Sequence, residues 1–246
     1  QRRRVSVQDI QNMDIDFELS EDSSSDDEDE EMNEDEQATA TSTPEEGTAY
    51  WIQRTVREAI YGRVAIGNVL QKVDNMYHAT NTMCAIKEMN WQHIRRERDR
   101  LAEDPVKEVS AMQFFKSWYT DQTTNTNKDL DTIVMMPLDL LSDERHLYSI
   151  MPYANGGELI ELLDMNEKFT ESESRYWMNQ ILNGLESLQR AGICHRDLSL
   201  ENLLVHNDSG ALVIDMGMCL RIPYNSDPSR GLITPQGTCG KWIYMS

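Results

Sequence analysis

The stretch Cys194–Leu204, CHRDLSLENLL, sets His, Arg and Asp side by side and places an Asn five residues after the Asp. A second acid, Asp215, opens a DMG triplet 18 residues after Asp197. Two short apolar runs separated by the polar sequence HNDSG lie between the two acids, and this pattern predicts a β-hairpin. Because a hairpin returns the chain to its start, we expect Asp197, Asn202 and Asp215 to converge at one end of it. Two carboxylates and an amide oxygen are hard donors that suit Mg²⁺ bound together with substrate phosphates.

Two helices are predicted upstream of this stretch. In EDPVKEVSAMQFFKSW, Asp104 is a suitable N-cap and Pro105 suits the first helical position. In TESESRYWMNQILNGLESLQRAG, Thr170 and Glu173 fit a capping box and Gly192 can end the helix. This second helix carries an apolar stripe at helical spacing, formed by Trp177, Ile181, Leu185 and Leu188.

The order of the predicted elements indicates an α+β fold. Strand-like runs occupy Met83–Lys87, Ile133–Leu138 and His146–Met151, and the first helix lies among them. The rest of the chain is mainly helix with the small hairpin. This order predicts two lobes with a cleft between them.

The first fifty residues differ in composition from the rest. The chain has 43 acidic and 23 basic residues, and residues 1–50 contain 17 of the acids and three arginines. Self-repelling charge with little apolar content cannot offset the entropy of ordering, so residues 1–50 are predicted to form a disordered acidic tail. The excess of acid also argues against a nucleic-acid partner.

The four cysteines, at positions 84, 194, 219 and 239, show no CxxC spacing. Reduced thiols in a cytosolic or nuclear setting therefore explain them better than a disulfide framework or a zinc site. No apolar run approaches the length of a membrane span, and no signal peptide is visible. We expect a cytoplasmic or nuclear protein without a membrane partner.

Taken together, these motifs resemble the eukaryotic protein kinases of the Ser/Thr type, and in particular the calcium/calmodulin-dependent and cyclic-nucleotide-dependent kinases. HRDLSLENLL and DMG resemble the catalytic loop and the metal-binding segment, and CAIK at Cys84–Lys87 resembles the phosphate-binding strand. HLYSIMPYANGGEL resembles the hinge, and GTCGKWIYMS resembles the end of the activation segment. The resemblance covers roughly residues 55–246 and implies that the later helices of the second lobe are missing after Ser246.

The resemblance assigns a role to each residue of the site. Lys87 would bind the α- and β-phosphates of ATP and be held by an ion pair with Glu108. Asp197 would accept or orient the proton of the substrate hydroxyl. Asn202 and Asp215 would hold Mg²⁺.

The resemblance also places the adenine of ATP at the hinge. The first residue after the gatekeeper Met151 is Pro152, which lacks an N–H but keeps the carbonyl that would accept from adenine. Ala154 would donate its N–H. Ala85 and Leu204 would lie on the two sides of the ring.

A glycine-rich loop over the phosphates is expected in GRVAIGNV, with Gly62, Gly67 and Val69 in the family pattern and Val64 in place of its middle glycine. Glu158 matches a position that meets the ribose or a substrate arginine. Glu201 matches another acid that meets substrate arginines, so a protein substrate with basic residues upstream of its hydroxyl is expected.

Ser199 stands where the family carries a lysine that contacts the transferred phosphoryl group. Ser can hydrogen-bond but brings no charge, and the loss of one preorganised cation can slow transfer by on the order of 10²-fold. Thr238 in GTCG is expected to contact Asp197. Ser229 and Thr234 are candidate sites for an activating kinase.

The predicted protein therefore has a tail over 1–50, a first lobe and hinge over 51–154, and a partial second lobe over 155–246. The expected function is Mg²⁺-dependent transfer of the ATP γ-phosphoryl group to a protein Ser or Thr. Two alternatives stay open. Val64 and Ser199 favour a pseudokinase that binds ATP or acts as a scaffold without useful transfer, and the acidic tail could instead be the working part of an interaction module.

Overall fold

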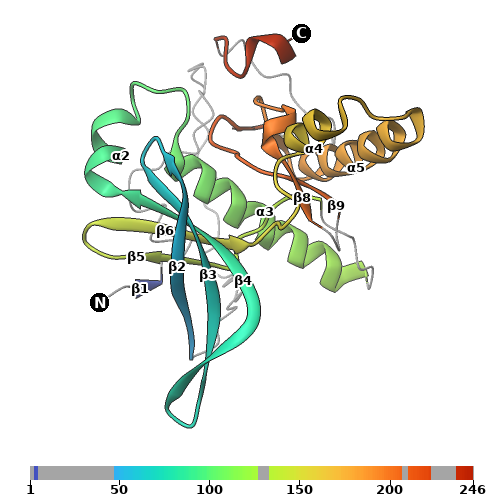
Figure 1. Ribbon diagram of the computed structural model, residues 1–246. Helices are drawn as coiled ribbons and strands as arrows, with labels where there is room; N and C mark the ends of the chain where they lie inside the picture. The colour runs from blue at the N-terminus through green and yellow to red at the C-terminus, as the bar shows by residue number, and fades with distance from the viewer. Residues whose placement is uncertain (1–2, 5–46, 127–132, 207–209, 223–236, 246) are drawn as a thin grey trace.

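The computed structural model describes residues 3–4, 47–126, 133–206, 210–222 and 237–245. One antiparallel sheet and the helices α2 and α3 are formed by residues up to Pro152, and two helices with two small sheets follow (Figure 1). The α+β fold predicted from the sequence is confirmed. No helix of the described residues is long and apolar enough to cross a membrane.

The large sheet has the strand order β1-β5-β6-β4-β3-β2, and each neighbouring pair is antiparallel. Its strands are β1 (Arg3–Arg4), β2 (Thr48–Ala59), β3 (Gly62–Val73), β4 (Met76–Asn90), β5 (Asp139–Ser142) and β6 (His146–Pro152). Strand β4 lies between β3 and β6, so the residues of its second half have a hydrogen-bonded neighbour on both sides.

Four helices are described: α2 (Trp91–Glu97), α3 (Pro105–Thr126), α4 (Leu159–Asn166) and α5 (Glu171–Arg190). The smaller elements are β7 (Ile193–Cys194), the 3-10 helix η1 (Leu200–Asn202), β8 (Leu203–His206), β9 (Gly210–Val213), β10 (Leu220–Arg221) and the 3-10 helix η2 (Trp242–Tyr244). Strands β8 and β9 form the predicted hairpin, and β7 pairs with β10. Helix α3 passes between the large sheet and the hairpin (Figure 1).

Both predicted helix starts are confirmed. The Asp104 side chain accepts from the backbone N–H groups of Val106 and Lys107 at 2.9 and 3.3 Å, and Pro105 is the first residue of α3. Thr170 and Glu173 form the capping box of α5. These caps satisfy backbone donors that a helix start leaves without a partner.

Two sequence expectations are wrong. Residues Ile133–Leu138 do not form a strand: Val134 makes only an isolated bridge to Val213, and β5 begins at Asp139. Pro137 lacks the N–H that a strand in this position would donate. The expectation of disorder over 1–50 fails at β1, because Arg3 and Arg4 extend the sheet along β5, and at the start of β2. Residues 5–46 lie outside the described residues.

Arg4 anchors strand β1 by its side chain as well as its backbone. Its Nε atom donates to Asp139 Oδ2 at 2.8 Å, and the Tyr50 hydroxyl donates to the same oxygen at 3.3 Å. A basic residue near the start of the given sequence thus pairs with an acid on β5. Composition averaged over fifty residues hides this local difference.

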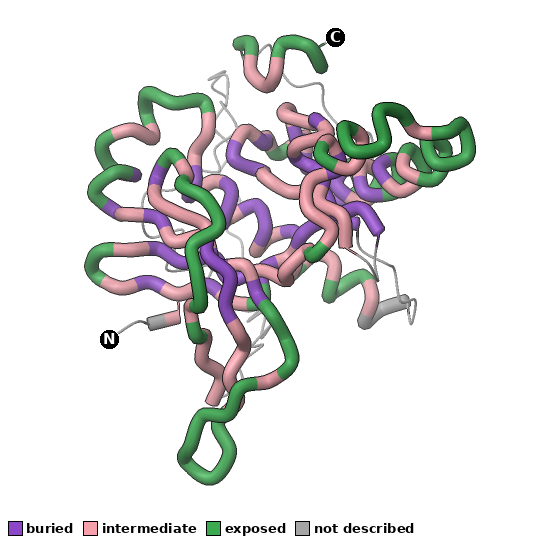
Figure 2. The backbone as a smooth tube through the Cα atoms, in the orientation of Figure 1, coloured by how far each residue is buried: buried purple, intermediate pink, exposed green. Residues whose placement is uncertain are grey.

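The apolar residues are buried in two clusters. The larger joins α3, α5 and the β8–β9 hairpin, with Val109, Met112, Phe115, Leu188 and Val213 all 2% exposed or less. The smaller lies on one face of the large sheet, where Cys84, Ile86, Tyr148 and Ile150 pack together. Buried backbone therefore follows the inner strands and α3, while the outer face of α5 is exposed (Figure 2).

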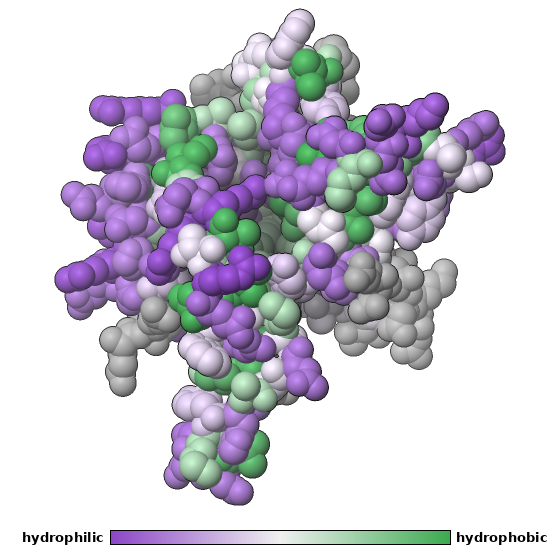
Figure 3. All heavy atoms as spheres, viewed as in Figure 1, coloured by the Kyte–Doolittle hydropathy of each residue, from purple (hydrophilic) through white to green (hydrophobic). Residues whose placement is uncertain are grey.

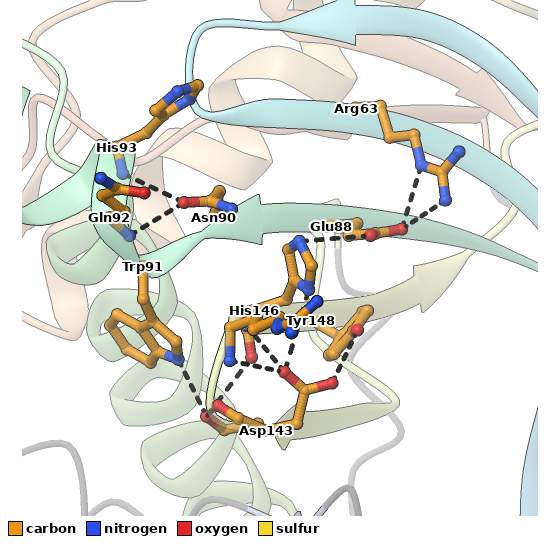
Figure 4. A network of polar contacts seen from close by, with 11 residues as sticks. Arg63, Glu88, Asn90, Trp91, Gln92, His93, Asp143, His146 and Tyr148 are labelled. Carbon is orange, nitrogen blue, oxygen red and sulfur yellow. Dashed lines mark hydrogen bonds and ion pairs between the residues drawn. The ribbon is translucent and has the colours of Figure 1, made fainter.

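A polar network fixes the turn from the sheet into α2 (Figure 4). The Asn90 side chain accepts from the N–H groups of Gln92 and His93, and the Trp91 indole N–H donates to Ser142 Oγ at 3.1 Å. The buried indole is therefore satisfied, and α2 starts where β4 ends.

The core role of α5 can be tested with two neighbouring residues. Ile181 is 7% exposed and Leu182 is 56% exposed. Replacing Ile181 by Ala should lower the free energy of unfolding by about 2–5 kcal/mol, because the lost apolar contact leaves a cavity. Leu182→Ala is the matched control and should change it by about 0.5 kcal/mol or less. Urea unfolding curves measure both, and equal losses would contradict this packing.

Candidate active site

Lys87 lies on the face of β4 that is turned toward α3. Side chains alternate along a strand, so Lys87 and Ala85 share one face and Cys84 and Ile86 share the other. Cys84 and Ile86 are buried in the smaller cluster. The Lys87 Nζ atom instead lies 2.5 Å from Glu108 Oε2 on α3. The ion pair expected from the sequence is therefore present in the structure.

Three carboxyl groups lie around this lysine. Oxygens of Glu103, Glu108 and Asp215 are within 4.8 Å of one another, and Lys87 Nζ lies 3.8 Å from Glu103 Oε1. Burial raises the pKa of Glu108 to about 6, although Lys87 opposes the rise. Burial alone would lower the pKa of Lys87, but Glu108 and Asp215 together raise it. The lysine stays charged, and the cluster brings together β4, α3 and the segment after β9.

Glu103 was not expected in this cluster. It lies just before α3, where the sequence has no periodic pattern that would place a side chain. Burial and the nearby Asp215 raise its pKa. Backbone contacts explain its position: the Tyr61 hydroxyl donates to the Glu103 carbonyl at 2.8 Å, and Asp104 N–H donates to the Gly217 carbonyl at 3.1 Å.

The catalytic-loop residues are joined to each other directly. The Asn202 side-chain amide donates to the Asp197 carbonyl at 2.8 Å and to Asp197 Oδ2 at 2.9 Å. The backbone carbonyl of Asn202 accepts from the N–H of Ile214 at 3.0 Å, and Ile214 directly precedes Asp215. Asp197, Asn202 and the segment of Asp215 therefore meet at the end of the hairpin, as predicted.

His195 supports this loop from inside. It is 4% exposed, its Nε2 atom lies 2.9 Å from the Ile214 carbonyl, and its Nδ1 atom faces the N–H of Asp197 at 3.3 Å. Burial lowers its pKa, so the neutral ring donates from Nε2 and accepts at Nδ1. This residue holds the catalytic loop against the segment before Asp215.

The hinge follows strand β6. Met151 pairs with Ala85, and Pro152 pairs with Cys84, so Pro152 occupies the last position of the strand. Beyond Ala154, the chain is bonded to the hairpin: Gly156 N–H donates to the Val205 carbonyl at 2.8 Å.

The hairpin and the start of α4 lie across from the large sheet. Leu204 on β8 makes an isolated bridge with Glu158, which precedes α4. The surface is hollowed between the sheet and the helical half of the molecule (Figure 3). Ala85 and Met151 are neighbours in the sheet, and Leu204 lies beside the start of α4.

The position expected for the glycine-rich loop is wrong. GRVAIGNV lies wholly in strand β3, and the turn comes before Gly62, at residues 60–61. Gly67 pairs with Cys84, and Val69 packs in the smaller cluster, so both lie on the face away from Lys87. The reason is strand register. Val64 is the residue of β3 that pairs with Lys87, and side chains alternate between the two faces, so Gly67, which pairs with Cys84, lies on the opposite face.

Val64, which interrupts the expected glycine pattern, instead lies directly opposite Lys87 and shares its face. Gly62 keeps a clear requirement for glycine, because a Cβ atom there would lie 2.0 Å from the Glu88 carbonyl oxygen. Counting back along the hairpin from Lys87 would have identified Val64 from the sequence.

Arg57, near the end of β2, reaches across to the helical half. Its guanidinium lies 2.7 Å from Glu158 Oε1. The Arg57 side chain is 58% exposed, so this ion pair is a surface contact of small energy. It occupies the acid that the sequence assigns to a ribose or a substrate arginine.

The end of the activation segment packs on the catalytic loop through residues other than the one expected. Thr238 is exposed, and Asp197 Oδ1 accepts instead from the backbone N–H of Lys241 at 3.1 Å. The Lys241 ammonium also donates to Ser199 Oγ at 2.6 Å. Ser229 and Thr234 lie outside the described residues.

Comparison with known proteins agrees with this geometry. Residues 57–246 match the family model for the protein kinase domain, and the chain belongs to the protein kinase family. The human hormonally up-regulated neu tumor-associated kinase is 31% identical over 130 residues, which cover 50% of this chain and 18% of that protein.

Two further relatives carry kinase names. The RAC family serine/threonine-protein kinase homolog of Dictyostelium discoideum is 39% identical over 107 residues, covering 42% of this chain and 22% of the relative. The putative protein kinase C delta type homolog of Drosophila melanogaster is 37% identical over 76 residues, which cover 31% of this chain and 11% of the relative. The matched regions span less than a quarter of each of the three relatives.

Replacing Lys87 by Met should destabilise the fold in a pH-dependent way. The change leaves three neighbouring carboxyl groups without their shared cation, at a cost of about 1–3 kcal/mol. The pKa of Glu108, about 6, is already above its ordinary value. Lys87 holds that pKa down, so its removal raises the pKa of Glu108 further. A raised pKa favours the protonated form in the folded state, so the mutant keeps its stability at low pH and loses it as pH rises toward neutrality. Urea unfolding at about pH 5 and about pH 7.5 measures the difference.

The matched control is Lys72→Met, which removes an exposed lysine on β3. It should leave stability almost unchanged at both pH values. An equal loss for Lys87→Met at the two pH values would contradict the carboxyl cluster.

Proposed function

We propose that the chain transfers the γ-phosphoryl group of ATP to a serine or threonine hydroxyl of a protein substrate, with Mg²⁺ as the metal. The single observation that carries the proposal is that Lys87, paired with Glu108, shares one cluster with Asp215. These residues come from the sheet, from α3 and from the segment after the hairpin. A lysine and a metal-binding acid brought together in this way suit a triphosphate.

The donors at the end of the hairpin fit a magnesium ion. Asn202 turns its amide nitrogen to Asp197, which leaves its carbonyl oxygen as the atom that can face a cation. Asp215 adds a carboxylate, and both are the oxygen donors that Mg²⁺ prefers. Asn202 and Asp215 would hold the ion, and Mg²⁺ would supply positive charge against the charge that develops during transfer.

Asp197 is proposed to orient the attacking hydroxyl and take its proton. The substrate oxygen forms a bond to the γ-phosphorus while the bond from phosphorus to the bridging oxygen breaks, and ADP leaves with that electron pair. Hydrogen bonds from Asn202 and from the backbone of Lys241 fix the Asp197 carboxylate for this task. Lys87 holds the remaining phosphates.

The proposed adenine site is the opening below the hinge. Pro152 and Ala154 would offer a carbonyl and an N–H to the base, and Ala85, Val64 and Leu204 would pack on its ring. Glu158 is proposed to bind the ribose or a substrate arginine once Arg57 leaves it. Arg57 would then act as a competitor for a basic substrate.

The choice of Ser or Thr rests on the likeness to serine/threonine kinases and on the catalytic loop ending in Glu201–Asn202. Substrates with basic residues upstream of the hydroxyl fit Glu158 and Glu201. We also propose a cytoplasmic or nuclear location, an activating kinase that acts on the activation segment, and the division at residues 51–154 and 155–246. A pseudokinase is the second candidate, because Ser199 removes a charge from the catalytic loop.

Substitution of Asp197 separates the two candidates. In the full-length protein, Asp197→Asn should lower transfer from labelled ATP to an Arg-rich serine peptide by about 10²–10⁴-fold, because the proton acceptor is lost. Stabilisation of the protein by Mg-ATP in a thermal shift assay should remain, because Asp197 does not hold the nucleotide.

Asp164→Asn, an exposed acid on α4, is the matched control and should keep full activity. A wild-type protein that is stabilised by Mg-ATP but transfers no phosphate would support the pseudokinase. A wild-type protein without any nucleotide-dependent shift would refute both candidates.

A further inference from the structure

A cation lies beside the loop of Asp197, although the loop's own sequence has no lysine there. Ser199 is 2% exposed and lies two residues after Asp197. Its Oγ atom accepts a hydrogen bond of 2.6 Å from the ammonium of Lys241, which is 42 residues later in the chain. An ammonium is therefore present beside the catalytic loop, although it comes from the activation segment.

The backbone around Lys241 is held against the loop. Lys241 N–H donates to Asp197 Oδ1 at 3.1 Å, and the Arg196 guanidinium donates to the Gly237 carbonyl at 3.1 Å. Gly240 has φ +90°, and a Cβ atom there would lie 2.7 Å from the Arg196 carbonyl oxygen. Only glycine allows this close approach. The lysine is thus delivered to one place, next to the carboxylate that faces the substrate hydroxyl.

The ammonium has a buried hydrogen-bond acceptor in Ser199, but its ion pair within the described residues is long. Its nearest carboxylate oxygen, Glu201 Oε2, is 3.7 Å away, and the two side chains are 38% and 35% exposed. An ion pair of this exposure is weak. The long, flexible lysine side chain can therefore exchange its hydrogen bond to Ser199 for one to a phosphate oxygen.

We propose that Lys241 supplies the cation that binds the transferred phosphoryl group, in place of a lysine at position 199. The inference rests on the proposed function, since it concerns the same transfer. As the new oxygen–phosphorus bond forms and the bond to the leaving ADP breaks, the Lys241 ammonium donates a hydrogen bond to a phosphoryl oxygen. It keeps its proton, and the hydroxyl proton goes to Asp197. The small Ser199 leaves room for the incoming side chain and accepts its hydrogen bond between turnovers.

This arrangement makes two positions complementary. A lysine at position 199 would meet the ammonium of Lys241, and like charges so close repel each other. Conversely, loss of Lys241 would leave Ser199 without its cation. Positions 199 and 241 should therefore behave as one unit, which needs a lysine at one of the two positions and not at both.

The test compares three variants of the full-length protein with the wild type, using the Arg-rich serine peptide as substrate. Lys241→Met should lower kcat by about 10²-fold, because one preorganised cation is lost from the transferring group. The KM for ATP should change by less than about threefold, since Lys87 and Mg²⁺ hold the other phosphates. Adding Ser199→Lys to Lys241→Met should restore kcat at least tenfold. Lys168→Met, an exposed lysine after α4, is the matched control and should have wild-type kcat.

The rescue separates a catalytic role from a purely structural one. Lys241→Met keeps the backbone hydrogen bond from residue 241 to Asp197. A lysine at position 199 restores the charge but not the side-chain contact from residue 241, so it rescues a catalytic role and not a purely structural one. Wild-type kcat in Lys241→Met, or no recovery in the double variant, would overturn the inference while leaving the proposed function intact. A wild-type protein that transfers no phosphate would overturn both.

Discussion

The contact between Lys87 and Glu108 is the interaction on which the rest of the site depends. It joins the central strand of the sheet to α3, and both side chains lie where water has little access. A buried lysine is tolerated because carboxylates stand around it. Asp215 belongs to the same group of carboxylates, so the pair also fixes where the segment after β9 must lie. The sheet, α3 and the hairpin therefore share one electrostatic centre.

The hairpin and its surroundings supply the second constraint. Asp197 and Asn202 are hydrogen-bonded to each other, and His195 contacts the carbonyl of the residue before Asp215. The backbone N–H of Lys241 donates to the Asp197 carboxylate. The contacts of His195 and Lys241 each involve a backbone group, and Asn202 also donates to the Asp197 backbone carbonyl. The loop that carries Asp197 is thus held by the fold itself, which is the preorganisation that the proposed phosphoryl transfer would require.

Much of this arrangement is predictable from the sequence, because local rules govern it. Capping residues predicted the starts of α3 and α5. The turn between two apolar runs predicted the β8–β9 hairpin. The positions of Asp197 and Asp215, before and after this hairpin, predicted that both lie at the same end of it. The glycine-rich loop was misplaced because strand register, not the glycine pattern, decides which side chains face Lys87. Lys241 and Glu103 were missed because each reaches the site from an irregular segment, where no periodicity reports direction. Strand β1 was missed because its two arginines lie in a segment dominated by acids.

A crystal structure of the protein with Mg²⁺ and a non-hydrolysable ATP analogue tests the central claim most directly. We expect Asn202 and Asp215 to bind Mg²⁺ at about 2.0–2.1 Å, and the Lys87 ammonium to lie within hydrogen-bond distance of the α- and β-phosphates while still paired with Glu108. An analogue bound away from Lys87, or a metal ion that touches neither Asn202 nor Asp215, would contradict the account.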